Sequence, residues 1–165
     1  MVDVRFKAFA VAGAVLVLDR ITKWIVETRV SFLDSLRVIP GFFDIVHTEN
    51  RGAAFSLFND STSEWRTWLL LVFSLAAVIL VGGFILQRAA KMDRLSLAGF
   101  ALILGGAAGN AIDRLVWGRV TDFLDFYLGA YHWPAFNVAD SAIVIGCALL
   151  LLQAMYPKRQ TAHVP

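Results

Sequence analysis

Four apolar stretches alternate with more polar segments along the chain. Three of them, residues 67–87, 95–112 and 135–156, carry no charge except Asp140. Each is close to the roughly 20 residues that a helix needs to cross a bilayer. The first stretch is interrupted by four charged residues, which are Lys7, Asp19, Arg20 and Lys23. The pattern predicts four transmembrane helices, at about residues 6–26, 67–87, 95–114 and 135–156.

The first stretch has a second interpretation as a secretory signal peptide, because Arg5 and Lys7 precede its apolar core. A charged cluster follows that core where a small-residue cleavage site would be expected, so a membrane helix is favoured. Composition agrees, since 58% of the 165 residues are hydrophobic, 17% are charged and the mean hydropathy is +0.66. A soluble domain is normally less apolar than this.

Basic residues are distributed unevenly between the segments that connect these helices. Residues 1–7, 88–94 and 157–165 hold seven lysines and arginines in 23 positions, whereas residues 27–66 and 113–134 hold six arginines in 62. Cytoplasmic loops of membrane proteins carry an excess of lysine and arginine. We therefore expect both termini in the cytoplasm and the two longer segments outside.

The first outer segment contains two short runs of β-branched and aromatic residues, 36–39 and 42–46, on either side of Pro40 and Gly41. Such runs around a turn dipeptide predict two strands. The expected fold is therefore an all-α membrane protein with four transmembrane helices and a small β-containing outer loop region. Because no repeat or linker interrupts the chain, we expect a single domain over residues 1–165.

Helix geometry places several polar residues near the outer surface. Asp19 lies about 20 Å along the first helix, which rises about 1.5 Å per residue, and so falls in the outer half of the bilayer. Asn110 and Asp113 close the third segment at its outer end. Asp140 lies about a turn and a half into the fourth segment, which enters from outside, and Asp122 lies in the outer segment between them.

Some of these groups have a purely structural interpretation. Asp19 and Lys23 are four residues apart, so they can neutralise each other on one helix face and hold helices together. Asp113 has Arg114 beside it and is open to the same interpretation. Asp140 differs, because no basic residue lies three or four positions to either side. An ionisable group of this kind in an apolar segment is costly and indicates a functional site.

Asp122 can supply a second carboxylate, because Gly118, Val120 and Thr121 disfavour the helical turn that would pair it with Arg119. Two carboxylates at a low-dielectric surface cannot both ionise cheaply, so one keeps a proton. Such a pair can activate water for peptide hydrolysis, but paired intramembrane acids also serve proton relays. The residues alone leave three classes open: an intramembrane peptidase, a small proton-coupled transporter and a structural membrane subunit.

The remaining reactive side chains exclude other classes. A single cysteine, Cys147, excludes an intrachain disulfide, and its apolar neighbours predict a buried packing role. His47, His132 and His163 lie in separate segments without metal-ligand spacing, which argues against a metallopeptidase. No basic patch indicates nucleic-acid binding.

At these polar residues the chain resembles lipoprotein signal peptidase, also called signal peptidase II, a family of bacterial intramembrane aspartic peptidases. The resemblance covers nearly the whole chain and rests on five ordered blocks, too many for chance agreement. The blocks are residues 19–23 (DRITK), 50–55 (NRGAAF), 105–114 (GGAAGNAIDR), 120–123 (VTDF) and 136–140 (FNVAD).

The resemblance implies that Asp122 and Asp140 are the catalytic pair, and that Asp19 and Lys23 hold the first helix in place. Further residues are implied to line or support the site, namely Asn50, Gly52, Asn110, Asp113, Arg114 and Asn137. It also implies the bacterial cytoplasmic (inner) membrane, both termini cytoplasmic, and an active site near the outer, periplasmic face.

The implied reaction removes the signal peptide from diacylglyceryl-modified prolipoproteins, on the amino side of the lipidated cysteine. The partners implied are these precursors and membrane lipid, with no nucleic acid. A monomer is expected, and neither a cofactor nor a metal ion is expected.

Overall fold

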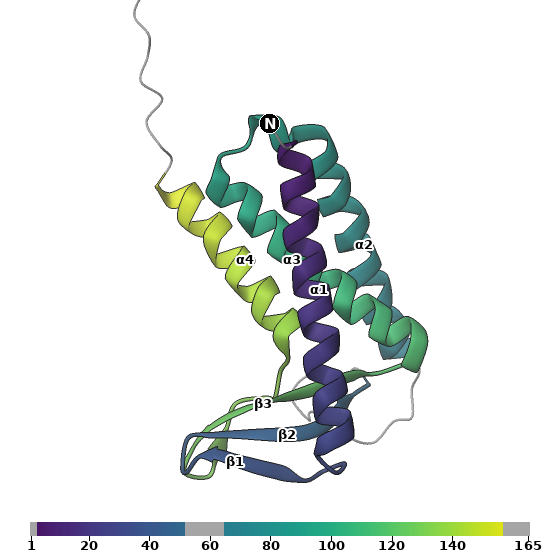
Figure 1. Ribbon diagram of the computed structural model, residues 1–165, viewed down its shortest axis with the longest axis vertical. Helices are drawn as coiled ribbons and strands as arrows, with labels where there is room; N and C mark the ends of the chain where they lie inside the picture. The colour runs from purple at the N-terminus through teal and green to yellow at the C-terminus, as the bar shows by residue number, and fades with distance from the viewer. Residues whose placement is uncertain (1–2, 52–64, 157–165) are drawn as a thin grey trace, which may run out of the picture.

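The computed structural model describes residues 3–51 and 65–156. Within them, long helices form one end of the molecule and a small sheet forms the other (Figure 1). The helices are α1 (Val4–Arg29), α2 (Trp65–Arg88), the short 3-10 helix η2 (Ala89–Lys91), α3 (Arg94–Trp117) and α4 (Val138–Met155). The strands are β1 (Ser35–Ile39), β2 (Phe43–Asn50), β3 (Val120–Leu128) and β4 (Tyr131–His132).

The sheet is antiparallel, in the order β1-β2-β3-β4, and it combines the segment that follows α1 with the segment between α3 and α4. β1 and β2 confirm the predicted pair of strands, and their turn contains Gly41 with a φ of +80°, which favours glycine. The sequence patterns did not predict β3 or β4. β3 pairs along β2 and carries Asp122 opposite Thr48, so Asp122 lies on a strand rather than in an irregular loop.

Three helical segments of the described chain are long and apolar enough to cross a membrane: Trp65–Lys91, Arg94–Trp117 and Val138–Met155. α1 has 26 residues, but its charged residues lower its hydropathy. Two of those charged residues, Asp19 and Lys23, are buried against the other helices. The fold is therefore mostly helical, with three candidate apolar spans and a small antiparallel sheet.

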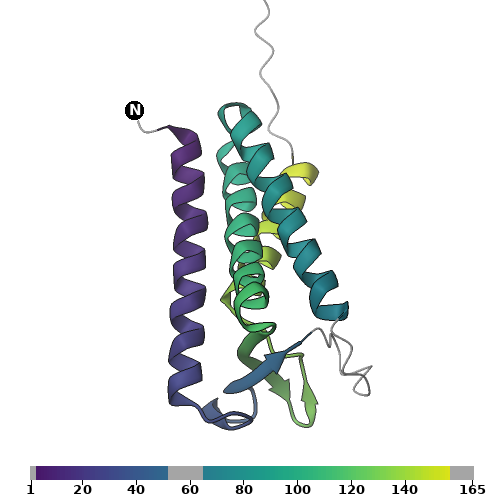
Figure 2. The same ribbon diagram turned by 90° about the vertical axis from the view of Figure 1, so that its right-hand side faces the viewer.

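α3 contacts each of the other three long helices and forms the centre of the bundle (Figure 2). A Cβ atom on Gly105 would lie 2.6 Å from the carbonyl oxygen of Ala12 in α1. One on Gly106 would lie 2.3 Å from the carbonyl oxygen of Ala139 in α4. Because both distances are far below a normal contact, these backbones can approach so closely only where α3 has glycine. The glycines thus fix α1 and α4 against the middle of α3.

α4 begins later than the predicted segment, which starts at residue 135. The backbone of Phe136 pairs instead with Leu124 of β3, and Asn137 caps the helix that starts at Val138. Asp140 therefore lies in the first turn of α4, not a turn and a half inside it. The remaining helix bounds differ from the predicted ones by three residues or fewer.

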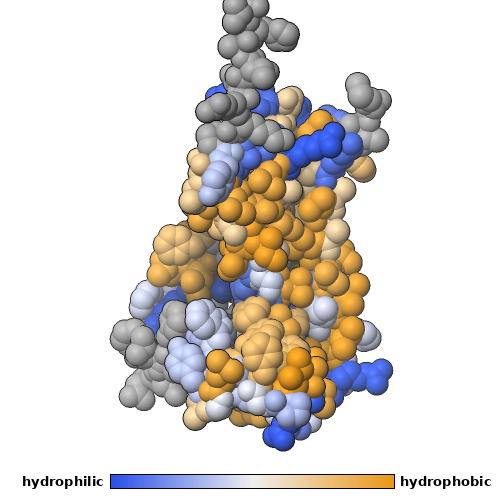
Figure 3. All heavy atoms as spheres, turned by 90° about the vertical axis from the view of Figure 1, so that its left-hand side faces the viewer, coloured by the Kyte–Doolittle hydropathy of each residue, from blue (hydrophilic) through white to orange (hydrophobic). Residues whose placement is uncertain are grey.

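The outward faces of the helices are apolar, as expected for a bundle with lipid as its solvent (Figure 3). The predicted buried position of Cys147 is wrong, because Cys147 is exposed on α4. α4 packs on its neighbours through the buried Ala139, Ala142 and Gly146, so the next residue points outward. Four tryptophans are also exposed, namely Trp65 and Trp68 at the start of α2, Trp117 at the end of α3 and Trp133 just after β4.

Candidate active site

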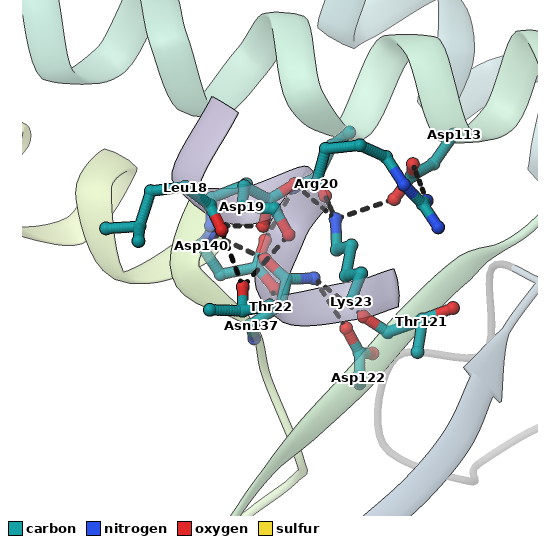
Figure 4. Close-up of polar contacts among 12 residues, drawn as sticks. Leu18, Asp19, Arg20, Thr22, Lys23, Asp113, Thr121, Asp122, Asn137 and Asp140 are labelled. Carbon is teal, nitrogen blue, oxygen red and sulfur yellow. Dashed lines mark hydrogen bonds and ion pairs between the residues drawn. The ribbon is translucent and has the colours of Figure 1, made fainter. Parts of the chain in front are cut away.

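The side chains of Asp122 and Asp140 lie close together, although they belong to different elements. Asp122 lies on β3 and Asp140 in the first turn of α4, with Asn137 between them (Figure 4). The Nδ2 of Asn137 donates to Oδ1 of Asp122 at 2.7 Å, and its Oδ1 accepts from the backbone N–H of Asp140 at 2.9 Å. One fully buried amide side chain therefore holds the two acids beside each other.

β3 holds Asp122 in a buried position, with only 4% of the residue exposed. Its carboxylate also accepts a hydrogen bond from Nδ2 of Asn50, at the end of β2, at 3.1 Å. Burial, reinforced by the negative charge of Asp140, raises the pKa of Asp122 to about 7. The amide hydrogen bonds and the charge of Lys23 act in the opposite direction but are weaker. A carboxyl group with this pKa readily binds a proton at neutral pH.

The start of α4 fixes Asp140 through a capping box with Asn137. The side chain of Asn137 accepts from the backbone N–H of Asp140, and Oδ2 of Asp140 accepts from the backbone N–H of Asn137 at 3.4 Å. On the other side, Asn110 of α3 donates from Nδ2 to Oδ1 of Asp140 at 2.7 Å. Asp140 is partly exposed, whereas Asp122 is buried, so Asp140 is the more accessible of the two acids.

A fully buried lysine connects α1 to α3. The Nζ of Lys23 donates to Oδ2 of Asp19 at 2.7 Å, to Oδ2 of Asp113 at 2.6 Å and to Oδ1 of Asn110 at 3.3 Å. The ammonium group therefore has an acceptor for each of its three donors. The expected pairing of Asp19 with Lys23 is present. Asn110 also binds Asp140, so a single side chain, that of Asn110, links Lys23 to the acid pair.

Asp19 connects α1 to the start of α4. Its Oδ1 accepts from the backbone N–H of Ala139 at 2.9 Å, while its Oδ2 binds Lys23. An acidic group near a helix N-terminus is stabilised by the unpaired N–H groups of the first turn. A Cβ on Gly109 of α3 would lie 2.9 Å from Oδ2 of Asp19, so glycine makes room for this carboxylate.

Arg114 and Asp113 bond to different partners, and the structural interpretation of Asp113 involves cations of α1 rather than its neighbour. Arg114 donates from Nη1 to the hydroxyl of Ser74 in α2 and to a backbone carbonyl one turn earlier, both at 3.3 Å. Asp113 binds Lys23 and, at 3.2 Å, Arg20 of α1. Successive helical residues point about 100° apart, so these two face different helices.

Two residues of this region have no counterpart among the predicted site residues. The hydroxyl of Thr121, next to Asp122 on β3, donates to Oε1 of Glu27 in α1 at 2.8 Å, and Glu27 also forms an ion pair with Arg20. Glu27 follows Arg20 by seven residues, so both lie on one helix face, which is the signal that could have indicated the pair. Gly52, a predicted site residue, lies outside the described residues.

The histidines of the described chain bind groups away from the acid pair. His47 bonds through Nδ1 to the carbonyl of Val30 at 2.8 Å, and His132 pairs with Asp125 at 2.9 Å. Over residues 3–51 and 65–156, no group of three or more histidine, cysteine, aspartate or glutamate side chains is arranged to hold a metal ion. His163 falls outside that part.

The site lies where the apolar helices meet the sheet. On the face drawn in Figure 3, a hollow with hydrophilic atoms separates the hydrophobic surface of the helices from the sheet end. A carboxylate pair of this kind is the arrangement that aspartic peptidases use. The fold and the site together define a helical membrane protein with an acid pair at one end of its bundle.

Comparison with known proteins identifies the family. The signal peptidase (SPase) II family matches residues 11–156, and the chain therefore belongs to it, as the sequence blocks indicated. The lipoprotein signal peptidase of Solibacter usitatus (strain Ellin6076) is 59% identical over 164 residues, which covers 99% of each chain. That of Nitratidesulfovibrio vulgaris (strain DP4) is 46% identical over 157 residues, covering 94% of this chain and 93% of the relative. The chain is accordingly a peptidase that processes lipoprotein precursors.

Two solved structures share the fold. One, described as a bacterial membrane enzyme structure by the in meso method at 2.3 Å resolution, has a TM-score of 0.80 and 28% identity, covering 96% of this chain and 94% of that chain. A second, at 1.9 Å resolution, has a TM-score of 0.77 and 29% identity, covering 93% and 94%. Together with the apolar spans, these likenesses indicate a bacterial membrane protein.

Proposed function

We propose that the chain is an intramembrane aspartic endopeptidase in which Asp122 and Asp140 act together on one water molecule. The substrate is a diacylglyceryl-modified prolipoprotein, and the bond cleaved is on the amino side of the lipidated cysteine. The observation that carries the proposal is the placement of both carboxylates against the buried side chain of Asn137. Membership of the signal peptidase II family supports the substrate class.

The two acids take different roles because their surroundings differ. Asp122 is the more buried of the pair and holds the shared proton, while Asp140 carries the negative charge and accepts a proton from the attacking water. Oxygen of that water bonds to the scissile carbonyl carbon, and Asp122 stabilises the developing oxyanion by donating its proton. When the C–N bond breaks, the leaving amine of the cysteine receives a proton from the pair.

The surrounding residues hold this pair in position. Asn50 and Asn137 bind Asp122, and Asn110 binds Asp140. The remaining support residues connect the helices of the bundle to one another, and they are Asp19, Lys23, Asp113 and Arg114. Gly52, outside the described residues, keeps its proposed place near the substrate. The chemistry requires neither a metal ion nor a cofactor, since a carboxylate activates the water.

The proposed topology has four transmembrane helices, with α1 as the fourth span, in the bacterial cytoplasmic (inner) membrane. Both termini are cytoplasmic and the acid pair is near the outer face. Support comes from the fold, because α1 begins and α4 ends at the end of the bundle away from the sheet (Figure 1). Residues 1–165 act as one domain and as a monomer, with acyl chains of the substrate remaining among the membrane lipids.

Cleavage of two precursors that differ only in lipidation tests the proposed substrate class. Purified protein in detergent is incubated with a lipidated and an unlipidated form of the same prolipoprotein, and the products are analysed by mass spectrometry. We expect a single cut immediately before the cysteine in the lipidated form and at least tenfold slower cleavage of the other. Equal cleavage of both forms would remove the lipid requirement, and a cut at another bond would contradict the proposed reaction.

A further inference from the structure

A polar connection joins β3 to α1 on the side of the strand that faces away from the acid pair. Thr121 donates its hydroxyl to Oε1 of Glu27 at 2.8 Å, and the other oxygen of Glu27 pairs with Arg20. Thr121 is 6% exposed, whereas the side chain of Glu27 is 31% exposed, so the bond between them is partly buried. Because side chains alternate along a strand, Thr121 faces α1 while Asp122 faces Asn137.

The connection continues from Arg20 back to the other acid. Arg20 also binds Asp113, at 3.2 Å, and Asp113 binds Lys23 at 2.6 Å (Figure 4). Lys23 reaches Asn110, which donates to Asp140. The polar contacts, together with the peptide bond between Thr121 and Asp122, therefore form a closed ring. Asn137 bridges the two acids on one side, and residues of α1 and α3 link them on the other.

We propose that Arg20, Glu27 and Thr121 form a brace that positions Asp122 for catalysis by tying β3 to α1. The brace rests on the proposed role of Asp122. None of its three side chains touches the acid pair, so these are positioning residues. Their contacts are long-range, joining α1 to β3 across 94 residues of sequence and to α3 across 93. The brace therefore sets where the strand lies relative to the helices.

The brace has a surface of its own, separate from the acid pair. A pocket of about 220 Å³ is lined by Arg20, Glu27 and Thr121, together with Asp113 and the ring of Trp117. The guanidinium of Arg20 lies 4.4 Å from the centre of that ring, a cation–π contact that holds it in place. Neither Asp122 nor Asp140 lines this pocket, so the brace can be altered without changing a residue that contacts the acids.

Loosening the brace has a specific electrostatic consequence. The groups that face Asp122 are Asp140 and Asn137 on α4, Asn50 on β2, Lys23 on α1 and, more distantly, Arg114 on α3. Burial is the main reason why the pKa of Asp122 is high. If β3 moves away from α1, water reaches the carboxyl group and this pKa falls towards its ordinary value. Loss of the brace should therefore change the pH profile as well as the rate.

The test compares Thr121→Val, which keeps the shape but removes the hydroxyl, with Thr121→Ser, which keeps the hydroxyl. Thr28→Val, a surface change next to Glu27 on α1, is the control, since the Thr28 hydroxyl bonds only to its own helix. For Thr121→Val we expect kcat to fall about 10- to 100-fold, as displaced catalytic groups do, with KM changed by less than about threefold. In Thr121→Val the decline of kcat/KM with rising pH should begin at a lower pH than in the unaltered protein. Thr121→Ser should keep both kcat and the pH profile of the unaltered protein.

Glu27→Gln provides a second variant, because glutamine still accepts from Thr121 but cannot form the ion pair with Arg20. It should lower kcat and move the pH profile in the same direction as Thr121→Val, to a smaller extent. A normal pH profile in both variants, or activity that falls only in proportion to folded protein, would overturn the brace. An inactive Asp122→Asn alongside a normal Thr121→Val would refute the brace alone, whereas an active Asp122→Asn would refute the proposed function.

Discussion

Asn137 and Lys23 are both fully buried, and each forms hydrogen bonds with several residues. The amide of Asn137 caps α4 and binds Asp122, so the same side chain begins the helix and orients one acid. The ammonium of Lys23 compensates two carboxylates, those of Asp19 and Asp113. Buried charges are tolerated only when paired and hydrogen-bonded, which is the case here. The position of the acid pair thus depends on a few buried side chains whose polar groups are all bonded.

The first prediction concerns pH. Because the pKa of Asp122 is raised to about 7, its proton is present below that pH and is lost as pH rises through it. The mechanism needs this proton, so kcat/KM should fall by about tenfold per pH unit above 7. The measurement is cleavage of lipidated precursor between pH 6 and 9, with Asp125→Asn retaining the same profile. A rate that stays constant or rises over this range would contradict the assignment.

The second prediction concerns Lys23. Replacement by alanine leaves Asp19 and Asp113 buried without their common cation, which should destabilise the fold by about 3–5 kcal/mol. The exposed Lys91→Ala is the control and should stay within about 0.5 kcal/mol. Thermal unfolding in detergent measures both. Equal stability of Lys23→Ala and Lys91→Ala would show that the buried network does not hold α1 to α3.

Sequence spacing could predict contacts within one helix but not between helices. The Asp19–Lys23 pair follows from a four-residue separation, and it is present. The partner of Asp113 could not be found in that way, because Lys23 is 90 residues away and only the packing of α1 on α3 brings it near. The contact between Glu27 and Thr121 was missed for the same reason, since Thr121 is on a strand that the pattern did not predict.

At the scale of elements, the site depends on how closely α4 approaches α3. Gly106 of α3 faces the carbonyl of Ala139, the residue before Asp140, and Gly146 of α4 lies as close to Gly99 of α3. Small residues at matching positions let the two helices pack without intervening side chains. The depth at which Asp140 is held is therefore set by glycines that have no chemical role.

The third prediction uses this packing. In Gly106→Ala the added Cβ would lie 2.3 Å from the carbonyl oxygen of Ala139, so α4 must move and take Asp140 with it. We expect a loss of about 1–3 kcal/mol in stability, as for other overpacked sites, and a large loss of activity. Gly83→Ala in α2 is the matched control, because nothing lies within 4 Å of its added Cβ. Full activity in Gly106→Ala would contradict this role of the helix contact.

The elements themselves were predictable to different degrees. The helices follow from their apolar length, and β1 with β2 follows from residues around Pro40 and Gly41. β3 was not predicted, because its pairing with β2 joins distant parts of the chain. The start of α4 was also misplaced, since apolar character continues through Ala135 and Phe136 while the cap at Asn137 decides where the helix begins.

At the scale of the whole molecule, the polar site and the sheet lie at one end of the bundle, and the η2 turn lies at the other (Figure 1). A transporter that relays protons would be expected to offer titratable groups across the depth of the membrane. In the described helices the buried charged residues gather near the sheet end, on α1 and α3. This arrangement favours chemistry at one face of the membrane over transport across it.

The fourth prediction is the orientation in the membrane. Single cysteines replace Tyr131, exposed on β4, and Lys91 in η2, in a Cys147→Ala background. In spheroplasts, a membrane-impermeant maleimide should label position 131 directly and position 91 only after permeabilisation. The basic residues near Lys91 are the physical reason, since they remain on the cytoplasmic side. Labelling of position 91 alone from outside would reverse the proposed topology.

The most direct test of the central claim is cleavage of lipidated precursor by Asp122→Asn, Asp140→Asn and the double variant, at matched levels of folded protein. Asparagine keeps the shape but can neither give nor take the catalytic proton, so each single variant should lose at least about 10²- to 10⁴-fold in rate. The double variant should be little worse, because the two acids act as a unit. Asp125→Asn, on the same strand but bound to His132, should cleave normally. Near-normal cleavage by either Asp122→Asn or Asp140→Asn would contradict the acid pair.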